Sequence, residues 1–337
     1  MASKSEFESW LVRDEAGLRC VPADVYIDPL RAVSRAIITH GHSDHARPGH
    51  GAVLATEETI AVMKARLGDD AAGRFQSLQL GETITMGGAK IRLAPAGHVL
   101  GSAQVVIEYQ GRRAVISGDY KRRHDPTTAP FELVRCDLFV TEATFGLPVF
   151  RHGEDADEIG RLLHSLQTFP DRTHLVGAYG LGKAQRVMAL LRSFGYDRTI
   201  WLHGALESMC RLYSDFGVDL GPTQPVTAAK DKLPGAVVIC PPSALNDRWS
   251  RRLTDPVTAF ASGWMRVRAR ARQRGVELPL VISDHCDWPE LIRTIEETGA
   301  EEIWVTHGRE DALVYQIEKM GKRGRALALI GLEEGGE

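Results

Sequence analysis

The chain has 337 residues, of which 43% are hydrophobic and 25% charged, a composition typical of a soluble globular protein with room for two domains. No apolar run approaches the length of a membrane span, and the polar amino-terminal residues lack a signal-peptide core, so we expect neither a membrane protein nor a secreted one. Five scattered cysteines without a C-x-x-C pair indicate reduced thiols and a cytoplasmic location.

Six short apolar runs each end at a polar side chain that can bind a metal or transfer a proton. Runs of this length, rich in valine and isoleucine, predict buried strands. The runs and the residues that follow them are Ala36–Thr39 before His40, Ile91–Gly97 before His98, Ala114–Gly118 before Asp119, Leu138–Thr141 before Glu142, Leu280–Asp284 before His285, and Ile303–Thr306 before His307. We expect one sheet system that presents these side chains along one edge.

Residues 150–280 have a different rhythm, in which strands and helices alternate. The predicted elements are strand Thr173–Tyr179, helix Lys183–Phe194, strand Thr199–His203, helix Leu206–Phe216 and strand Ala236–Cys240. Such alternation predicts a parallel α/β unit. Because candidate site residues lie both before and after this unit, we expect it to be an insertion into the first domain.

The net charge of −3 conceals an uneven distribution. Residues 151–284 carry 18 basic against 14 acidic side chains, whereas residues 285–337 carry 6 against 12. Within the basic segment, arginine occupies every second position from Arg266 to Arg274, with Arg248, Arg251 and Arg252 shortly before. Charge alone leaves two interpretations open, a surface that contacts phosphates or a solvated helix face.

Gly177–Lys183 matches the glycine and lysine positions of a phosphate-binding loop, between a predicted strand and a predicted helix. The next residue is Ala184, where that motif needs a hydroxyl for magnesium, so we do not expect nucleotide hydrolysis. Lys183 and the loop amides remain candidates for binding an anion at the start of a helix.

The segment His40–His45 places three imidazoles and a carboxylate within six residues: His40, His42, Asp44 and His45. Imidazole and carboxylate are the ligands that zinc and its first-row neighbours accept. With alternating side chains, His40 and His42 converge on one metal while Asp44 and His45 face a second. The segment therefore indicates a metallohydrolase.

In the order H-x-H-x-D-H, then His98, then Asp119, the chain resembles the metallo-β-lactamase superfamily. That resemblance assigns Asp28 to the carboxylate that supports the metal-binding loop. Three further segments resemble motifs A, B and C of the β-CASP nucleases within that superfamily: Thr141–Gly146, Ile282–Trp288 and Val305–Gly308. Other details, such as Ser262–Met265, are most similar to the bacterial ligase-associated DNA exonucleases, which are often described as RNA 3′-end processing exonucleases.

The resemblance implies an α/β fold, a metallo-β-lactamase αββα sandwich with an inserted β-CASP α/β domain. The catalytic domain would comprise residues 1–146 and 284–337, and the β-CASP domain residues 147–283. Nearly the whole chain is covered by the match, because the insert coincides with the α/β unit described above.

The resemblance also implies a ligand set for two divalent metal ions, zinc first, with manganese or iron as alternatives. His40, His42 and His98 would bind one ion, Asp44, His45 and His307 the other, and Asp119 both. A metal-activated hydroxide would attack phosphorus, oriented by Asp44. His285 would donate a proton or a hydrogen bond, held in the useful tautomer by Glu142. The substrate-binding candidates are Lys121, Lys183, Arg266, Arg268 and Arg270.

The function expected from this is that of a two-metal phosphodiesterase, a DNA exonuclease in end processing that works with a DNA ligase and helicase repair system. An RNA-processing β-CASP ribonuclease is the close alternative, since His307 is shared with those enzymes. More remote alternatives are a thioester or lactam hydrolase and a scaffold without activity. The scaffold is disfavoured because every expected ligand is present.

Overall fold

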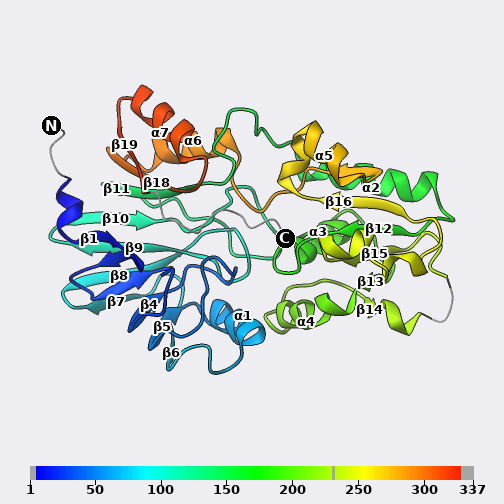
Figure 1. The fold of residues 1–337 in the computed structure, drawn as a ribbon, viewed down its shortest axis with the longest axis horizontal. Helices are drawn as coiled ribbons and strands as arrows, with labels where there is room; N and C mark the ends of the chain where they lie inside the picture. The colour runs from blue at the N-terminus through cyan, green and yellow to red at the C-terminus, as the bar shows by residue number, and fades with distance from the viewer. Residues whose placement is uncertain (1–4, 230–231, 328–337) are drawn as a thin grey trace. The chain divides into compact units, whose positions relative to one another are not determined.

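The computed structural model describes residues 5–229 and 232–327 (Figure 1). The chain forms two compact units. The first comprises the described residues within Met1–His124, Thr128–Phe150 and His285–Gly336, and the second those within Asp125–Thr127 and Arg151–Asp284. Strands and helices are mixed in both units, which confirms the α/β class.

The first unit contains two sheets. One has six strands in sequence order: β1 (Leu11–Asp14), β2 (Gly17–Cys20), β3 (Val25–Ile27), β4 (Arg35–Ile37), β5 (Ala52–Ala55) and β6 (Phe75–Ser77). The other has seven, in the order β19 (Arg323–Ala326), β18 (Glu302–Gly308), β11 (Leu138–Ala143), β10 (Arg112–Ile116), β9 (Ala103–Tyr109), β8 (Ala89–Pro95) and β7 (Thr83–Met86). The helices are η1 (Glu6–Ser9), α1 (Glu57–Leu67), α6 (Trp288–Glu297) and α7 (Glu310–Lys319).

Alternating side chains of the seven-stranded sheet enter two separate cores, as the period of two in a strand requires. In β10, Ala114 and Ile116 pack in a core shared with the six-stranded sheet, whereas Val115 packs in a core shared with α6 and α7. A third core lies between α1 and the strands β4 and β5. The first unit is therefore layered as helix, sheet, sheet and helices, and Figure 1 shows α6 and α7 beside β18 and β19.

The prediction of a single sheet system is wrong, because the six apolar runs belong to three different sheets. Ala36–Thr39 leads out of the six-stranded sheet, four runs belong to the seven-stranded sheet, and Leu280–Asp284 follows a strand of the second unit. Sequence patterns predict strands from local periodicity, but that periodicity does not state which strands pair.

The second unit is built on one parallel sheet, as the alternation of strands and helices predicts. Its strand order is β14 (Thr223–Pro225), β13 (Ile200–Leu202), β15 (Val237–Cys240), β12 (His174–Gly177), β16 (Val257–Ala261) and β17 (Leu278–Leu280). The helices are α2 (Asp155–Thr168), α3 (Lys183–Ser193), α4 (Glu207–Asp215) and α5 (Arg268–Arg274). Strands β12 and β15 are buried throughout, the pattern of a sheet covered on both faces.

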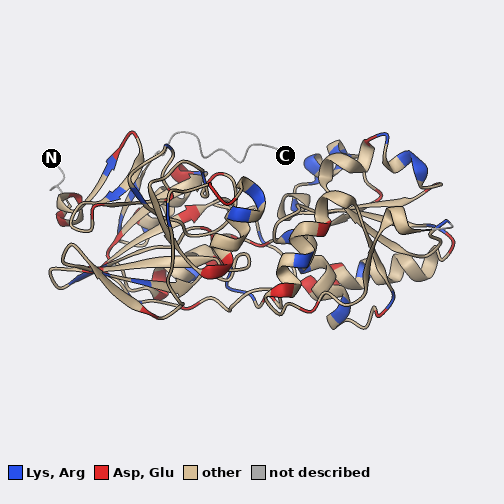
Figure 2. Ribbon diagram, turned by 90° about the horizontal axis from the view of Figure 1, so that it is seen from below, with Lys and Arg blue, Asp and Glu red and all other residues tan. Residues whose placement is uncertain are grey.

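Short 3₁₀ turns follow several strands of this unit: η2 (Gly204–Leu206), η3 (Val226–Ala228), η4 (Pro242–Asn246), η5 (Ser250–Arg252) and η6 (Gly263–Arg266). Basic and acidic segments are interspersed in both units (Figure 2). Among the described residues no helix is both long and apolar enough to cross a bilayer.

Candidate metal centre

Side chains from both sheets of the first unit meet in one buried cluster. His40 lies beyond the end of β4, His98 beyond β8 and Asp119 beyond β10. The ring nitrogens of three histidines converge: His42 Nδ1 is 3.2 Å from His40 Nε2 and 3.0 Å from His98 Nε2. Together with a carboxylate oxygen of Asp119, these atoms lie within 4.8 Å of one another. The sequence order of the ligands thus corresponds to spatial convergence.

A second group shares the same aspartate. His45, Asp119 and His307 also offer ligand atoms within 4.8 Å of one another. One oxygen of Asp119, Oδ2, lies 3.4 Å from His40 Nε2 and 3.4 Å from His45 Nε2, which places it between the two groups. Asp44 stands at the border, with its Oδ2 3.7 Å from His45 Nε2.

Asp28 holds the metal-binding loop through both carboxylate oxygens. Oδ1 accepts a hydrogen bond from the Thr39 amide at 2.8 Å, and Oδ2 lies 2.6 Å from Thr39 Oγ1 and 2.7 Å from His45 Nδ1. Because Nδ1 of His45 faces the carboxylate, Nε2 is left to face the cluster. Asp28 adopts a positive φ of 44°, a conformation that aspartate tolerates better than most residues.

Thr39 is a positioning residue that the sequence reasoning did not single out. Its Oγ1 lies 3.1 Å from His40 Nδ1 while also bonding Asp28. Gly118, at φ 55°, approaches this threonine so closely that a Cβ on the glycine would lie 2.7 Å from Thr39 Oγ1. A threonine directly before the first histidine and a glycine directly before the aspartate were the signals available in the sequence.

A bulge directs His307 into the cluster. In the pairing of β11 with β18, Glu142 lies opposite Thr306 and Ala143 opposite Gly308, so His307 is the additional residue. Its φ is 56°, and its ring stacks on that of His45 at 4.6 Å. Bulges next to functional sites re-aim a side chain in this way.

The buried Glu142 and the half-buried His285 form a pair next to the cluster. His285 Nδ1 lies 3.0 Å from Glu142 Oε2, the other carboxylate oxygen accepts from the Tyr120 amide at 2.8 Å, and the His285 ring is 4.5 Å from that of His98. The amide of Cys286 donates to the carbonyl of Tyr120, which fixes the backbone beside His285. Burial raises the pKa of Glu142, against the opposing effect of His285.

The donor set fits divalent metals. Among the residues that the structure describes, His45 Nε2, Asp119 Oδ1 and both ring nitrogens of His307 are buried without a hydrogen-bond partner. Buried polar atoms are normally hydrogen-bonded, because burying them unpaired is costly. Imidazole nitrogens and a carboxylate oxygen left in this state are suited to hold a cation.

The protonation states of His40, His307 and Asp119 match this fit. Burial and the neighbouring His45 lower the pKa of His307 to about 4, and burial holds the pKa of His40 well below its usual value. Although burial opposes ionisation, His45 and the other imidazoles hold the pKa of Asp119 well below the usual range. Neutral imidazole and ionised carboxylate are the forms that bind metals. Against the effect of burial, the carboxylates of Asp119, Asp44 and Asp28 hold the pKa of His45 well above its usual value, so His45 would release a proton on binding a cation.

Two predicted substrate-binding lysines are buried. Lys121 follows Asp119 and Tyr120 and is 2% exposed. Lys183, 3% exposed, forms an ion pair with Asp284. At the start of α3, the Gly182 amide donates to Gln185 Oε1 and the Ala184 amide to a backbone carbonyl. These internal contacts already occupy Lys183 and two of the loop amides, and anion binding by this loop stays a prediction.

The arginine run forms the short helix α5, in which positions two apart do not share a face. Arg270 lies 3.8 Å over the ring of Trp264, and Arg274 lies 4.8 Å over that of Phe260. Arg266 and Arg268 are exposed. Arg270 and Arg274 are exposed as well, so the run differs in that these two arginines also pack on aromatic rings.

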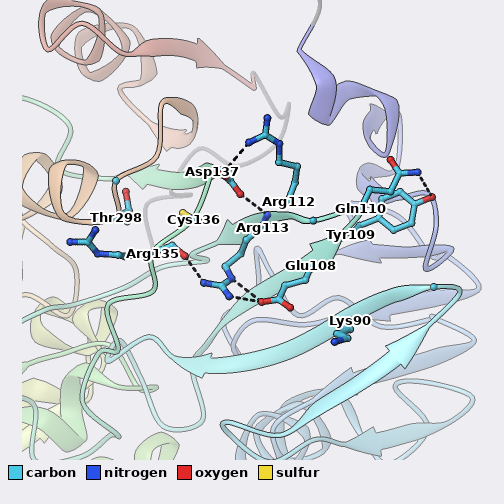
Figure 3. A pocket seen from close by; sticks show the side chains of 13 residues that line it. Lys90, Glu108, Tyr109, Gln110, Arg112, Arg113, Arg135, Cys136, Asp137 and Thr298 are labelled. Atoms are coloured by element: carbon cyan, nitrogen blue, oxygen red, sulfur yellow. Dashed lines mark hydrogen bonds and ion pairs between the residues drawn. The ribbon is translucent and has the colours of Figure 1, made fainter.

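A groove of about 650 Å³ lies elsewhere in the first unit, at the opposite ends of the strands (Figure 3). It is lined around the hairpin of β9 and β10, where Arg113 pairs with Glu108 at 2.6 Å and its amide donates to Asp137. The predicted site residues do not line it. The size of this groove does not by itself make it a reaction site, because the side chains in the described part of the chain that could hold a metal ion lie in the cluster and not in the groove.

No family model matches the chain. Individual proteins do. The chain is 27% identical over 326 residues to a probable DNA ligase of Opitutus terrae, a match that covers 94% of this chain and 31% of that protein. It is 23% identical over 389 residues to Ribonuclease TTHA0252 of Thermus thermophilus, covering 91% and 88%. Endoribonuclease YSH1 of Eremothecium gossypii is 26% identical over 204 residues, covering 49% and 26%. Two of these three relatives are named as ribonucleases, which agrees with the resemblance to the β-CASP metallo-β-lactamase nucleases.

These similarities confirm the resemblance derived from the motifs, and they support the expectation of an enzyme of the nuclease class. The chain spans less than a third of the length of the probable DNA ligase and most of the length of the ribonuclease. Among solved structures, a protein of unknown function from Enterococcus faecalis V583 superposes with a TM-score of 0.60 at 15% identity, covering 88% of this chain and 79% of that one. That similarity concerns the fold.

Proposed function

We propose that the chain is a two-metal phosphodiesterase acting on nucleic acid, a DNA exonuclease of end processing. The observation that carries the proposal is the pair of ligand groups sharing Asp119, with buried nitrogen and oxygen atoms that lack hydrogen-bond partners among the described residues. The layering of the first unit supports a metallo-β-lactamase αββα sandwich, residues 1–146 and 284–337. The parallel sheet of the second supports an inserted β-CASP domain, residues 147–283.

His40, His42 and His98 would hold one metal ion, Asp44, His45 and His307 the other, and Asp119 both. Zinc suits this set best, and manganese or iron are alternatives. When bound, such ions polarise a phosphate oxygen and lower the pKa of water. Asp28 keeps His45 in the tautomer that presents Nε2, through the contact at Nδ1.

The remaining steps belong to side chains of the chain itself. Glu142 accepts from Nδ1–H of His285, so Nε2 is the atom that meets the scissile phosphate or gives a proton to the leaving oxygen. The Asp44 carboxylate, 33% exposed, accepts a hydrogen bond from the attacking water and orients it toward phosphorus. His285 suits the transfer of a proton to the leaving oxygen because the usual pKa of a histidine lies near neutrality.

DNA is the proposed substrate, and association with a ligase is supported by the ligase-titled relative of three times this length. The ribonuclease relatives favour RNA as the second candidate. Exposed Arg266 and Arg268 are the proposed contacts to phosphates.

The test is digestion of end-labelled single- and double-stranded DNA and RNA of matched sequence by protein loaded with Zn²⁺ or Mn²⁺. We expect DNA to shorten from one end and His42→Ala to abolish the reaction, while His164→Ala, an exposed histidine of α2, leaves it intact. If labelled DNA and RNA remain intact with both Zn²⁺ and Mn²⁺, the proposal is wrong. If RNA is degraded faster than DNA, RNA is the substrate.

A further inference from the structure

A second surface of the molecule combines exposed positive charge with aromatic rings. It lies in the second unit beyond the carboxyl ends of β13 and β15, where His203 directly follows β13 and the segment of η4 and η5 follows β15. We call it the tryptophan patch, made of His203, Arg248, Trp249, Arg251 and Arg252. In parallel sheets, ligands bind beyond the carboxyl ends of the strands.

The rings of His203 and Trp249 pack against each other edge to face, with centroids 4.5 Å apart. Both side chains are half-buried, so the core holds them in place while part of each ring faces outward. The guanidinium of Arg252 lies 5.6 Å from the Trp249 ring. The patch therefore presents a fixed aromatic surface beside a cation.

The proton on His203 is placed by its local contacts. Its Nδ1 accepts a hydrogen bond from the Ala205 amide at 3.1 Å, so Nε2 carries the proton in the neutral ring. Burial and the nearby Arg252 lower the pKa of His203. The ring is therefore a neutral aromatic donor, suited to a nucleobase.

The cations of the patch are available. Arg248, Arg251 and Arg252 are exposed, and among residues 5–229 and 232–327 they form no ion pair. The nearby Asp247 accepts from the Arg248 amide and is the acidic group closest in sequence. Arg270 is also exposed, but its guanidinium lies closer to the Trp264 ring, at 3.8 Å from the centroid, and so covers the ring face that a base would need.

We propose that the tryptophan patch binds single-stranded nucleic acid, with an unpaired base stacked on Trp249 and His203 and neighbouring phosphates bound by Arg248, Arg251 and Arg252. Aromatic rings beside cations are the common means of holding single strands, because every base has a face to stack. A duplex hides those faces and meets only the charges. The inference rests on the proposed function in that nucleic acid is the substrate, and it adds a preference for unpaired strands.

The test measures binding rather than cleavage. The metal-loaded protein is titrated with fluorescein-labelled phosphorothioate oligothymidylate, which resists hydrolysis, and with a phosphorothioate duplex of equal length. We expect Trp249→Ala to raise the Kd for the single strand about tenfold and the Kd for the duplex less than twofold, since stacking contributes to one alone. Trp249→Phe should keep most of the affinity.

The double variant Arg251→Ala with Arg252→Ala should bind both the single strand and the duplex more weakly. It should also reduce the slope of log K against log salt by about 0.7 per lost phosphate contact on the single strand. Arg211→Ala, an exposed arginine of α4, is the matched control and should change neither. If Trp249→Ala lowers the melting temperature, tryptophan fluorescence provides the test instead. Quenching by the single strand in wild type, but not in Trp249→Phe, would show that a base stacks on Trp249.

Equal single-strand affinity of Trp249→Ala and wild type would overturn the patch, as would equally effective competition by polyglutamate, which would identify a surface for acidic protein segments. If wild-type protein cleaves nucleic acid but the patch variants bind normally, only this inference fails. If wild-type protein neither binds nor cleaves, the proposed function fails as well.

Discussion

Two groups of buried charged side chains, one in each unit, show how a site differs from a structural contact. In the second unit, Arg186 is fully buried and pairs through its two terminal nitrogens with Asp125 and Asp155. In the first unit, His45 and Asp119 are buried and His307 is half-buried, yet several of their polar atoms are enclosed without a hydrogen-bond partner among the described residues.

Burial alone therefore does not identify function. The arginine group balances its own charge and holds the segment Asp125–Thr127 in the second unit, whereas the histidine group fits an additional cation. Lys183 is a similar case. Its loop resembles a phosphate-binding loop in sequence, but its ammonium group is paired with Asp284. The kind of unsatisfied atom separates the two cases: the arginine group leaves only a donor, Arg186 Nε, without a partner in the described structure, whereas the histidine group leaves imidazole nitrogens and a carboxylate oxygen that can hold a cation.

The largest expected effect tests the structural group. Arg186→Met leaves the buried Asp125 and the half-buried Asp155 without their counter-charge, and removing one partner of such a group costs about 3–5 kcal/mol of unfolding free energy. Urea unfolding should show this loss, while elemental analysis at low urea shows unchanged metal content. Arg211→Met, exposed on α4, is the control and should cost little. A stability equal to wild type would show that the group is not structural.

A smaller effect tests the metal group. Asp28→Asn keeps the shape of the side chain but removes the charge facing His45 Nδ1, and the loss of such a contact weakens metal binding about 10–100-fold. Competition with a chromogenic chelator measures the affinity, with exposed Asp69→Asn as the control. Unchanged affinity would mean that Asp28 supports only the backbone.

The smallest effect concerns pH. His174 is buried between the Ser165 hydroxyl, 2.9 Å from Nε2, and the Arg172 carbonyl, 3.3 Å from Nδ1, and burial lowers its pKa below the usual value. As the pH falls below about 6.5, the unfolded chain binds a proton that the folded one refuses, so stability decreases by at most about 1.4 kcal/mol per pH unit.

His174→Gln removes this titration, so the variant should lose less stability than wild type when urea unfolding is compared at pH 7.5 and 5.5. Parallel losses in the two proteins would assign the acid sensitivity to other groups, such as the histidines of the metal centre.

The sequence by itself indicated the candidate ligand residues and their order, because motif spacing and short apolar runs are local properties. It also determined the alternating strands and helices of the second unit, whose predicted bounds differ from β12, α3, β13, α4 and β15 by one or two residues. The same local reasoning did not identify Thr39, nor the packing of Arg270 and Arg274 on aromatic rings, since both depend on contacts through space.

Only the tertiary structure decided how those residues act. It brought ligands from two sheets together, inserted His307 through a bulge, set Asp28 against His45, and paired Lys183 with Asp284. The physical reason is that hydrogen bonding and charge pairing depend on distances of a few ångströms between segments far apart in the chain, and sequence spacing does not contain those distances.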